Sequence, residues 1–261
     1  MTTARPVGQD QPVPFLARRW ADHLPSVSVV VPTLNEEANI GHVLRHMPGW
    51  VDEVVVVDGR SVDRTVELAR ETRPDVTIVL ERTPGKGAAL SAGFRAARGD
   101  IIAAIDADGS MDPGELHAYV GQLMAGADLV KGTRFAQGGG TVDMELHRKL
   151  GNLGLLAVVR LLFGGRYTDL CYGYFAFWRQ SLDVLNPDVD GFEIETLINV
   201  RALKAKLRVA EVASFEARRL HGVSNLNAMR DGLRILRTIF RERFTRGRLD
   251  RTATSRHRPV R

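Results

Sequence analysis

Two aspartates, separated by one residue, stand where an apolar run of the chain ends. Asp106 and Asp108 follow the run 101–105, and Gly109 comes directly after them. Such a run predicts a buried strand, and ligands bind at the carboxyl ends of the strands in an open parallel sheet. Two carboxylates this close repel each other unless a cation lies between them. The pair therefore indicates either a hard divalent ion, Mg²⁺ or Mn²⁺, that shares substrate phosphates, or a solvated acidic turn.

Other polar residues follow the neighbouring apolar runs. Pro32, Asn35 and Glu36 come after the first run, and we expect Pro32 to end that strand; Asp58 follows the second run. Carboxylates in these places can accept hydrogen bonds from a ribose or a base N–H group, although they can also cap helices. Lys86 stands between two glycines at a predicted helix start. There it meets a phosphate or the base, or it is only an exposed turn lysine.

The order of these runs predicts an α/β protein with a mostly parallel, twisted sheet flanked by helices. Continuous apolar strands that alternate with helices are typical of parallel strands buried on both faces. After residue 135 the pattern changes to a glycine-rich loop, a long apolar helix over 144–163 and a terminal helix over 227–244. We expect strands at 27–31, 54–57, 76–80, 101–105, 128–131, 174–178 and 207–212.

The composition is that of a folded protein with a basic end. The 261 residues are 44% hydrophobic, carry a net charge of +5 and include one cysteine, Cys171, which we expect to be a packed thiol. An intrachain disulfide is excluded, and we expect neither a transmembrane helix nor a signal peptide. Residues 241–261 hold eight arginines against two acids, so the rest of the chain is nearly neutral. We therefore expect no nucleic-acid partner.

Four motifs, in order, resemble those of a family 2 glycosyltransferase. They are VVVPTLNEE at 29–37, VVDGRSVDRT at 56–65, GKG at 85–87 and DADG at 106–109. Within that family the chain most resembles dolichyl- or polyprenyl-phosphate mannosyl- and glucosyltransferases, over about residues 27–225. The resemblance implies a GT-A (Rossmann-like) fold, a nucleotide-sugar donor and a divalent metal, Mg²⁺ or Mn²⁺.

The resemblance also implies roles for single residues. It implies that Asp108 binds the metal and that Asp106 contacts the nucleotide or the metal. GTR at 132–134 matches a family motif whose arginine faces phosphates, which suits the forked, permanent charge of Arg134; a structural salt bridge is the alternative. The other members of the nucleotide-sugar site are expected to be Pro32, Asn35, Glu36, Asp58 and Lys86.

Three further residues are candidates near the acceptor or the metal. In the family a Thr-Asp pair with aromatic residues and a glycine lies near the acceptor, and relatives also carry a helix that begins like GFEIE at 191–195. Asp169 and Glu195 are therefore expected to bind the acceptor or act as general base. His221, in the loop that ends the similarity, would be a further metal ligand or would contact the diphosphate. Each of the three can instead be a surface or capping residue.

The sequence thus predicts an inverting, metal-dependent glycosyltransferase that moves a hexose from GDP-mannose or UDP-glucose to a polyprenyl phosphate. Two alternatives stay open. One is a glycosyltransferase that acts on a hydroxyl of a soluble or cell-wall acceptor, and the other is a non-catalytic sugar-nucleotide-binding or membrane-scaffold protein. A phosphate acceptor needs no strong base, because its second pKa is about 6. A hydroxyl acceptor needs a carboxylate such as Asp169 or Glu195.

The terminal helix has a basic and an apolar side. It fits an anionic membrane surface, or it docks on the domain with a solvated basic rim. We expect a cytoplasmic protein, with peripheral attachment at the inner face of the cell membrane left open. The apolar residues expected near one face are Leu226, Met229, Leu233, Leu236, Ile239, Phe240 and Phe244. The expected segments are a flexible leader at 1–25, a GT-A domain at 26–226 (nucleotide-sugar half 26–134, acceptor half 135–226), the basic helix at 227–246 and a disordered basic tail at 247–261.

Overall fold

A seven-stranded sheet organises the chain in the computed structural model, which describes residues 24–142, 144–223 and 227–245. The strand order is β3-β2-β1-β4-β7-β5-β8, and β7 alone in this sheet is antiparallel to its neighbours. The mostly parallel sheet that the sequence predicts is therefore confirmed. The strands are β1 (Val27–Thr33), β2 (Glu53–Asp58), β3 (Thr77–Leu80), β4 (Ile101–Ala104), β5 (Leu129–Thr133), β7 (Phe175–Trp178) and β8 (Val209–Ala213).

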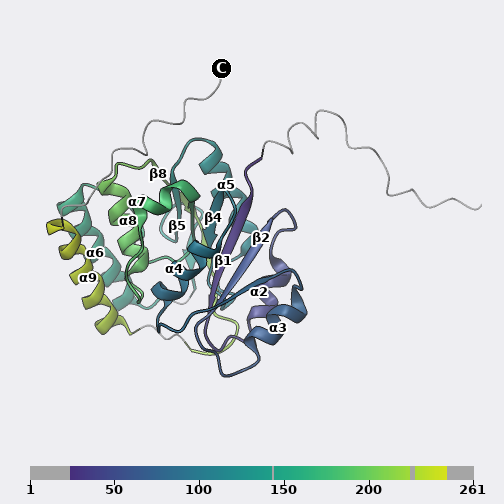
Figure 1. The fold of residues 1–261 in the computed structure, drawn as a ribbon. Coiled ribbons are helices and arrows are strands. Elements are labelled where there is room, and N and C mark those ends of the chain that lie inside the picture. The colour runs from purple at the N-terminus through teal and green to yellow at the C-terminus, as the bar shows by residue number, and fades with distance from the viewer. Residues whose placement is uncertain (1–23, 143, 224–226, 246–261) are drawn as a thin grey trace, which may run out of the picture.

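Helices cover both faces of this sheet (Figure 1). Side chains alternate between the faces of a strand, so Val29 and Val31 pack under one helical layer and Val30 under the other. The first layer is α2 (Ile40–His46), α3 (Thr65–Thr72) and α5 (Leu116–Met124). The second layer is α4 (Lys86–Ala96), α7 (Leu182–Leu185) and α8 (Ile194–Lys204).

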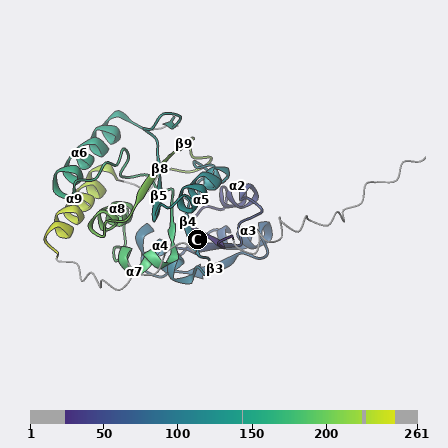
Figure 2. The ribbon, with the colours of Figure 1, turned by 90° about the horizontal axis from the view of Figure 1, so that it is seen from above.

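Two long helices form a third cluster beside α8. They are α6 (Leu146–Phe163) and α9 (Ala228–Phe244), which lie side by side at one margin of the molecule (Figures 1 and 2). Val159 of α6, Val200 of α8, and Ile235 and Ile239 of α9 share a core there. No helix in the described part of the chain is long and apolar enough to span a bilayer. The expected tail, Leu226 and nearly all of the expected leader lie outside the described residues.

Pro32 does not end the first strand, contrary to the prediction. β1 continues to Thr33, and Pro32 pairs with Val57 of β2. On the other side, pairing of β1 with β4 ends at Val30 and Ala104, although Val30 O still accepts a hydrogen bond from Ile105 N. The missing N–H of Pro32 therefore faces a side where the neighbouring strand has ended. A proline is tolerated in a strand where no ladder bond is required of it.

The two expected halves of the domain share the same sheet. β7, from the second half, lies between β4 and β5 of the first half. A small second sheet, β6 (Gly140–Thr141) paired with β9 (Phe215–Glu216), also joins distant segments of the chain. The division of labour between 26–134 and 135–226 stays a prediction, but it does not correspond to two separate layers of structure.

Candidate active site

A pocket of about 310 Å³ opens beyond the carboxyl ends of β1, β4 and β5. This is the edge at which an open parallel sheet binds its ligands. Arg148 of α6 and Ile235 of α9 also line it, so the pocket reaches the outer helix pair. Four predicted residues, Asn35, Asp58, Asp169 and His221, are not part of its lining. The predicted residues that do line it are Pro32, Glu36, Lys86, Asp106, Asp108, Arg134 and Glu195.

Lys86 joins two carboxylates in the floor of this pocket. Its Nζ lies 2.7 Å from Asp106 Oδ1 and 2.8 Å from Glu195 Oε1, and its side chain is 14% exposed. Burial by itself would lower the pKa of Lys86, but the two carboxylates outweigh it and raise that pKa well above its usual value. Burial raises the pKa of Glu195, and the charge of Lys86 opposes that rise. Lys86 is therefore a permanent cation between Asp106 and Glu195.

The first amide groups of α4 donate to another loop of the protein, whereas a role for the Lys86 side chain toward a phosphate or the base stays a prediction. These amides, Gly87 N and Ala88 N, donate to Asp190 O at 2.7 and 3.2 Å. A Cβ on Gly87 would lie 2.3 Å from Val189 O. The glycines therefore let the 189–191 loop pack against the helix start, and that loop uses the donors that a phosphate would need.

Gly173, in the loop before β7, completes the Lys86 cluster. A Cβ at this position would lie 2.7 Å from Lys86 Nζ and 3.1 Å from Asp106 Oδ2. A glycine here lets the lysine and its two carboxylates meet without any of these side chains having to shift. The sequence showed a glycine between two tyrosines and gave no reason for it, because the reason lies in residues that are distant along the chain.

Arg219 forms a second ionic bridge, between Glu36 and Asp108. Its Nη1 lies 2.8 Å from Glu36 Oε1 and its Nη2 lies 3.1 Å from Asp108 Oδ2. Asp108 Oδ1 accepts hydrogen bonds from Ser110 N at 2.9 Å and Ser110 Oγ at 2.7 Å. The loop that carries Arg219 is fixed there, since Leu220 N donates to Asp108 O. Sequence reasoning chose His221 from this loop and gave Arg219 no role.

His221 does not join the aspartates. Its backbone oxygen accepts a hydrogen bond from Asn39 Nδ2 at 3.1 Å, and the residue is exposed. Among the described residues, no three His, Cys, Asp or Glu side chains are grouped so that they could hold a metal ion. The carboxylate oxygens of Asp106 and Asp108 are nevertheless the donors that Mg²⁺ or Mn²⁺ prefers, and such ions take most of their shell from water and substrate phosphates. The donor set fits a metal that arrives with its substrate.

Arg134 is bound to carboxylates from two sides. Its Nε and Nη2 lie 2.7 and 3.0 Å from the two oxygens of Asp169, and its Nη1 lies 3.0 Å from Glu216 Oε2. Asp169 is fully buried, and although burial would raise its pKa, Arg134 and Lys131 hold that pKa below the usual value. The salt bridge that was the alternative for Arg134 is present. Asp169, enclosed and outside the pocket lining, is not placed to act as a general base.

Asn35 and Asp58 shape the rim beside β1 and β2. Asn35 Oδ1 accepts from Val62 N at 2.9 Å, which ties the two loops together. Asp58 Oδ2 accepts from Arg60 N and Ser61 N at 3.1 and 3.0 Å. Its other oxygen is buried and has no hydrogen-bond partner among the described residues. Asn35 and the first oxygen of Asp58 thus have structural roles, and the second oxygen of Asp58 is enclosed without a partner among the described residues.

Arg148 is the functional candidate that sequence reasoning missed altogether. Three other cations line the pocket, namely Lys86, Arg134 and Arg219, and each is paired with carboxylates. Arg148 is partly buried in the same lining, and its side chain has no ion-pair or hydrogen-bond partner within the described part of the chain. The sequence offered no signal, because Arg148 is one of several basic residues on a helix that reads as plain core.

The acids of the pocket are all engaged. Glu36 and Asp108 bind Arg219, Asp106 and Glu195 bind Lys86, and Glu216 binds Arg134, all within ion-pair distance. Cys171 also lines the pocket, but burial raises the pKa of its thiol to about 12, so it supplies no thiolate. Among the described residues, the lining therefore offers one unpaired cation and no free carboxylate.

Known proteins resemble this chain in sequence and in structure. The sequence model of glycosyl transferase family 2 matches residues 28–185. An uncharacterised glycosyltransferase of Mycobacterium tuberculosis is 46% identical over 109 residues, which are 42% of this chain and 49% of that protein, so the chain spans about half of that relative. Polyprenol monophosphomannose synthase of Mycolicibacterium smegmatis is 33% identical over 238 residues, 85% of this chain and 88% of that protein.

A solved structure has the same fold. Glucosyl-3-phosphoglycerate synthase from Mycobacterium tuberculosis, in complex with Mn²⁺, UDP and glucosyl-3-phosphoglycerate, matches with a TM-score of 0.67 at 27% identity and covers 90% of this chain and 86% of its own. The predicted GT-A-like fold is thereby confirmed. One relative is named for a polyprenol product and the other for a phosphoglycerate product, so both names contain a phosphate but they differ in the acceptor.

Proposed function

This chain belongs to glycosyl transferase family 2, and from that premise we propose that it transfers a hexose from a nucleotide sugar, GDP-mannose or UDP-glucose, to the phosphate of a polyprenyl phosphate. Arg148 carries the proposal. It is the pocket cation that has no partner among the described residues, and it lies on α6, toward the outer helix pair and away from the donor loops of β1 and β2. A partly buried arginine without a counter-ion favours an anionic ligand, and its fork suits a phosphate.

The engaged carboxylates support a phosphate as the attacking group. A hydroxyl acceptor needs a base to remove its proton, and the described lining holds no carboxylate that is free of an ion pair. The second pKa of a phosphate is about 6, so a phosphate oxygen is largely ionised at neutral pH. Such an oxygen attacks without a base, and the protein has only to position it.

We propose that the donor binds at the other end of the pocket, beside β1 and β2. We also propose that Asp58, at the carboxyl end of β2 and next to the lining residue Gly59, accepts a hydrogen bond from the ribose or the base. Mg²⁺ or Mn²⁺ would be held by Asp108, which would exchange its ion pair with Arg219 for the metal, with Asp106 or Glu36 beside it, and the metal would neutralise charge on the leaving nucleoside diphosphate. The guanidinium of Arg219, which lies between Glu36 and Asp108, is a second positive charge next to the diphosphate.

The reaction then requires little movement of protons. A phosphate oxygen of the acceptor forms a bond to the anomeric carbon from the face opposite the diphosphate, and the bond from that carbon to the diphosphate oxygen breaks with its electron pair. The sugar is inverted, and the diphosphate leaves as an anion beside Arg219. We further propose that the protein is peripheral at the inner face of the membrane that holds the lipid acceptor. A lipid acceptor would require this location.

The test compares acceptors and one pair of variants. Purified protein is given labelled GDP-mannose or UDP-glucose with Mn²⁺, and either a short-chain polyprenyl phosphate or 3-phosphoglycerate. Label that enters the organic phase identifies the lipid product. Arg148→Ala should raise the KM for the acceptor roughly tenfold to a hundredfold, the range expected when one charged hydrogen bond is lost. Arg148→Lys should recover part of that loss, and Arg45→Ala, an exposed arginine on α2 outside the lining, should leave the acceptor KM unchanged.

Two results would contradict the proposal. Label that appears only in phosphoglycerate would make the acceptor soluble. An unchanged acceptor KM in Arg148→Ala would remove the observation on which the proposal rests, whatever the acceptor proves to be.

A further inference from the structure

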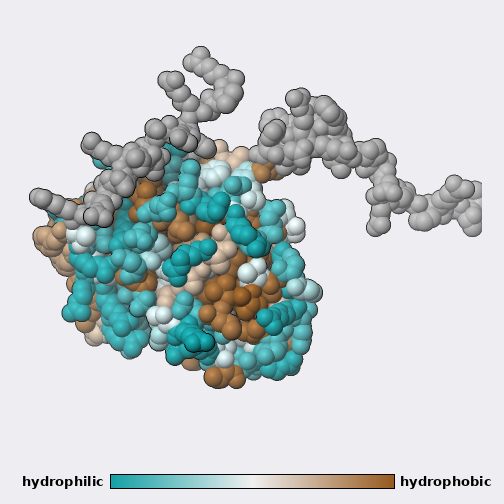
Figure 3. Space-filling view, in the orientation of Figure 1, coloured by the Kyte–Doolittle hydropathy of each residue, from teal (hydrophilic) through white to brown (hydrophobic). Residues whose placement is uncertain are grey.

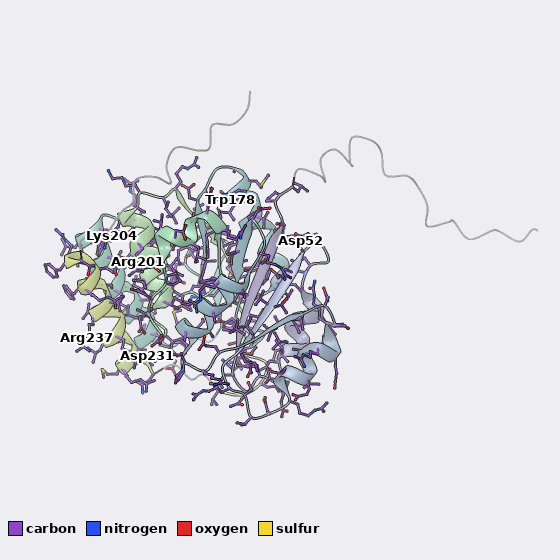
Figure 4. All side chains as sticks on the ribbon, viewed as in Figure 1. Asp52, Trp178, Arg201, Lys204, Asp231 and Arg237 are labelled. Atoms are coloured by element: carbon purple, nitrogen blue, oxygen red, sulfur yellow. The ribbon has the colours of Figure 1, made fainter. Side chains whose placement is uncertain are left out.

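α9 docks on the domain through one face. Its buried residues include Ile235, Ile239 and Glu242, which recur at helical spacing. Glu242 is held there by Arg201 Nη2 at 3.0 Å and Lys204 Nζ at 2.8 Å, both from α8. Figure 4 places Arg201 and Lys204 beside α9 on the side of the domain body. These contacts hold one face of the helix against the domain, and its other face lies at the surface.

The outer face of α9 is apolar as well. Five apolar residues form one stripe along the helix, because the last four lie 4, 7, 11 and 15 positions after Met229. Ile239, which the sequence assigned to this side, is fully buried instead. A helix at the surface of a protein normally turns charged residues outward. The stripe is Met229 (79% exposed), Leu233 (63%), the half-buried Leu236, Phe240 (44%) and Phe244 (80%).

Every exposed charge of α9 is positive. Its two acids, Asp231 and Glu242, are 1% and 3% exposed. Its arginines are all exposed, and Figure 4 shows Arg237 on the outer side of the helix. Four of them follow the apolar stripe one residue later and so form a parallel row. The row is Arg230, Arg234, Arg237 and Arg241, with Arg243 on the other flank.

α6 repeats this pattern beside α9. Its exposed apolar residues have the same spacing along the helix as the stripe of α9, and no acid occurs within the helix. Its charged residues are Arg148, Lys149 and Arg160. In the orientation of Figure 1 the two helices form the left margin, where Figure 3 shows hydrophobic side chains among hydrophilic ones. The stripe of α6 is Leu146, Leu150, Leu153, Ala157 and Leu161.

From these two stripes we propose that the α6–α9 surface binds an anionic phospholipid bilayer, with its apolar side chains among the acyl chains and its arginines at the headgroups. Apolar stripes whose exposed charged neighbours within the helices are all cations fit such an interface. A second copy of the chain, applied to the same surface, would bring arginines against arginines. The partner of a cationic, apolar surface should be anionic and apolar. A bilayer that contains anionic lipid has both properties.

The α6–α9 surface lies next to the reaction pocket. Arg148 of α6 and Ile235 of α9 both line the reaction pocket, so the pocket reaches the helix pair that would lie on the lipid. The phosphate of a lipid acceptor would then enter the pocket while its hydrocarbon chain stays in the membrane. This inference deepens the proposed function, since it names the surface that a lipid acceptor requires, but binding to a bilayer can be measured without catalysis.

The experiment measures sedimentation of the full chain with vesicles. Vesicles of phosphatidylcholine mixed with phosphatidylglycerol are compared with phosphatidylcholine alone, at low and at physiological salt. Each arginine near an anionic surface is worth about fivefold in partitioning, so Arg237→Gln with Arg243→Gln should weaken binding about twenty-fivefold. The control, Arg45→Gln with Arg70→Gln on α2 and α3, removes the same charge from exposed positions on other helices and should have little effect.

A second variant tests the apolar stripe. Leu233→Ser with Phe244→Ser should reduce binding at least tenfold, because two apolar side chains no longer enter the bilayer. Val62→Ser with Leu80→Ser removes comparably exposed side chains elsewhere and should not. All of these positions are exposed, and unchanged melting temperatures confirm that the variants fold.

The outcomes separate this inference from the proposed function. It is overturned if the protein ignores anionic vesicles at low salt, if the α9 variants bind as their controls do, or if the stripe mediates self-association that Leu233→Ser with Phe244→Ser abolishes. If wild-type protein binds vesicles but transfers no sugar to short-chain polyprenyl phosphate, the surface stands and the proposed acceptor fails. If the protein transfers sugar to that acceptor but does not bind vesicles, the acceptor stands and the surface fails.

Discussion

Lys86→Met should destabilise the protein strongly, because the variant leaves two carboxylates facing each other without a cation. Lys86 Nζ lies within 2.8 Å of both Asp106 Oδ1 and Glu195 Oε1. Methionine keeps most of the length and the apolar contacts of lysine, so the main loss is the charge. Removing one partner of a buried ion pair costs about 3–5 kcal/mol, because the remaining charge stays buried and unpaired. Asp106 is 26% exposed and keeps some water, which favours the lower end, about 3 kcal/mol.

The pH dependence of this loss has a defined sign. Burial already raises the pKa of Glu195, and removing Lys86 takes away the main influence that lowers it. A carboxyl group whose folded pKa lies above its unfolded value of about 4.3 favours the folded state when it is protonated. The stability deficit of Lys86→Met relative to wild type should therefore shrink as the pH falls from about 7 toward 5 and grow as the pH rises.

Urea denaturation at several pH values measures both effects. The matched control is Arg98→Met, which breaks the bridge to Glu53 from a side chain that is 79% exposed and should cost less than about 1 kcal/mol. Adding Glu195→Gln to Lys86→Met should restore at least about 1 kcal/mol, because one unpaired charge is gone. A deficit no larger than that of the control, or one that does not change with pH, would refute the description of Lys86 as a buried bridge.

Two further predictions concern the residues around this cluster. Asp108→Asn should abolish Mn²⁺-dependent binding of the donor nucleotide, measured by calorimetry. The melting temperature should change little, because Glu36 still holds Arg219. Normal metal-dependent binding in this variant would exclude Asp108 as a metal ligand. Gly173→Ala should cost about 1–3 kcal/mol by thermal denaturation and slow transfer, since its Cβ would lie 2.7 Å from Lys86 Nζ. Its control is Gly151→Ala, where nothing lies within 4 Å of the added Cβ and the helix should gain slightly; equal effects of the two would mean that the loop before β7 moves freely.

The fold class was determined by local sequence. Apolar runs of strand length, separated by amphipathic stretches, fix alternating strands and helices because each run must be buried on both faces. The strands from Val27, Glu53 and Ile101 appear within two residues of where the runs place them. The carboxylates at the ends of β2 and β4 could be assigned to one edge of the sheet for the same reason, since parallel strands end together. The position of Pro32 could not be judged, because a proline is tolerated or excluded according to where the neighbouring strand ends.

The ionic connections of the site were decided only by tertiary structure. Lys86 and Glu195 are 109 residues apart, and Glu36 and Arg219 are 183 apart, yet each pair lies at 2.8 Å. Residue type alone made Asp169 a candidate base, but the fold buries it against Arg134. Arg148 could not be chosen from the sequence for the same reason. It matters because it has no ion-pair partner among the described residues, whereas the other pocket cations are paired, and the sequence does not show which charges are paired. Sequence determines which charges exist and where elements begin, because those depend on neighbours along the chain; which charge is neutralised depends on neighbours in space.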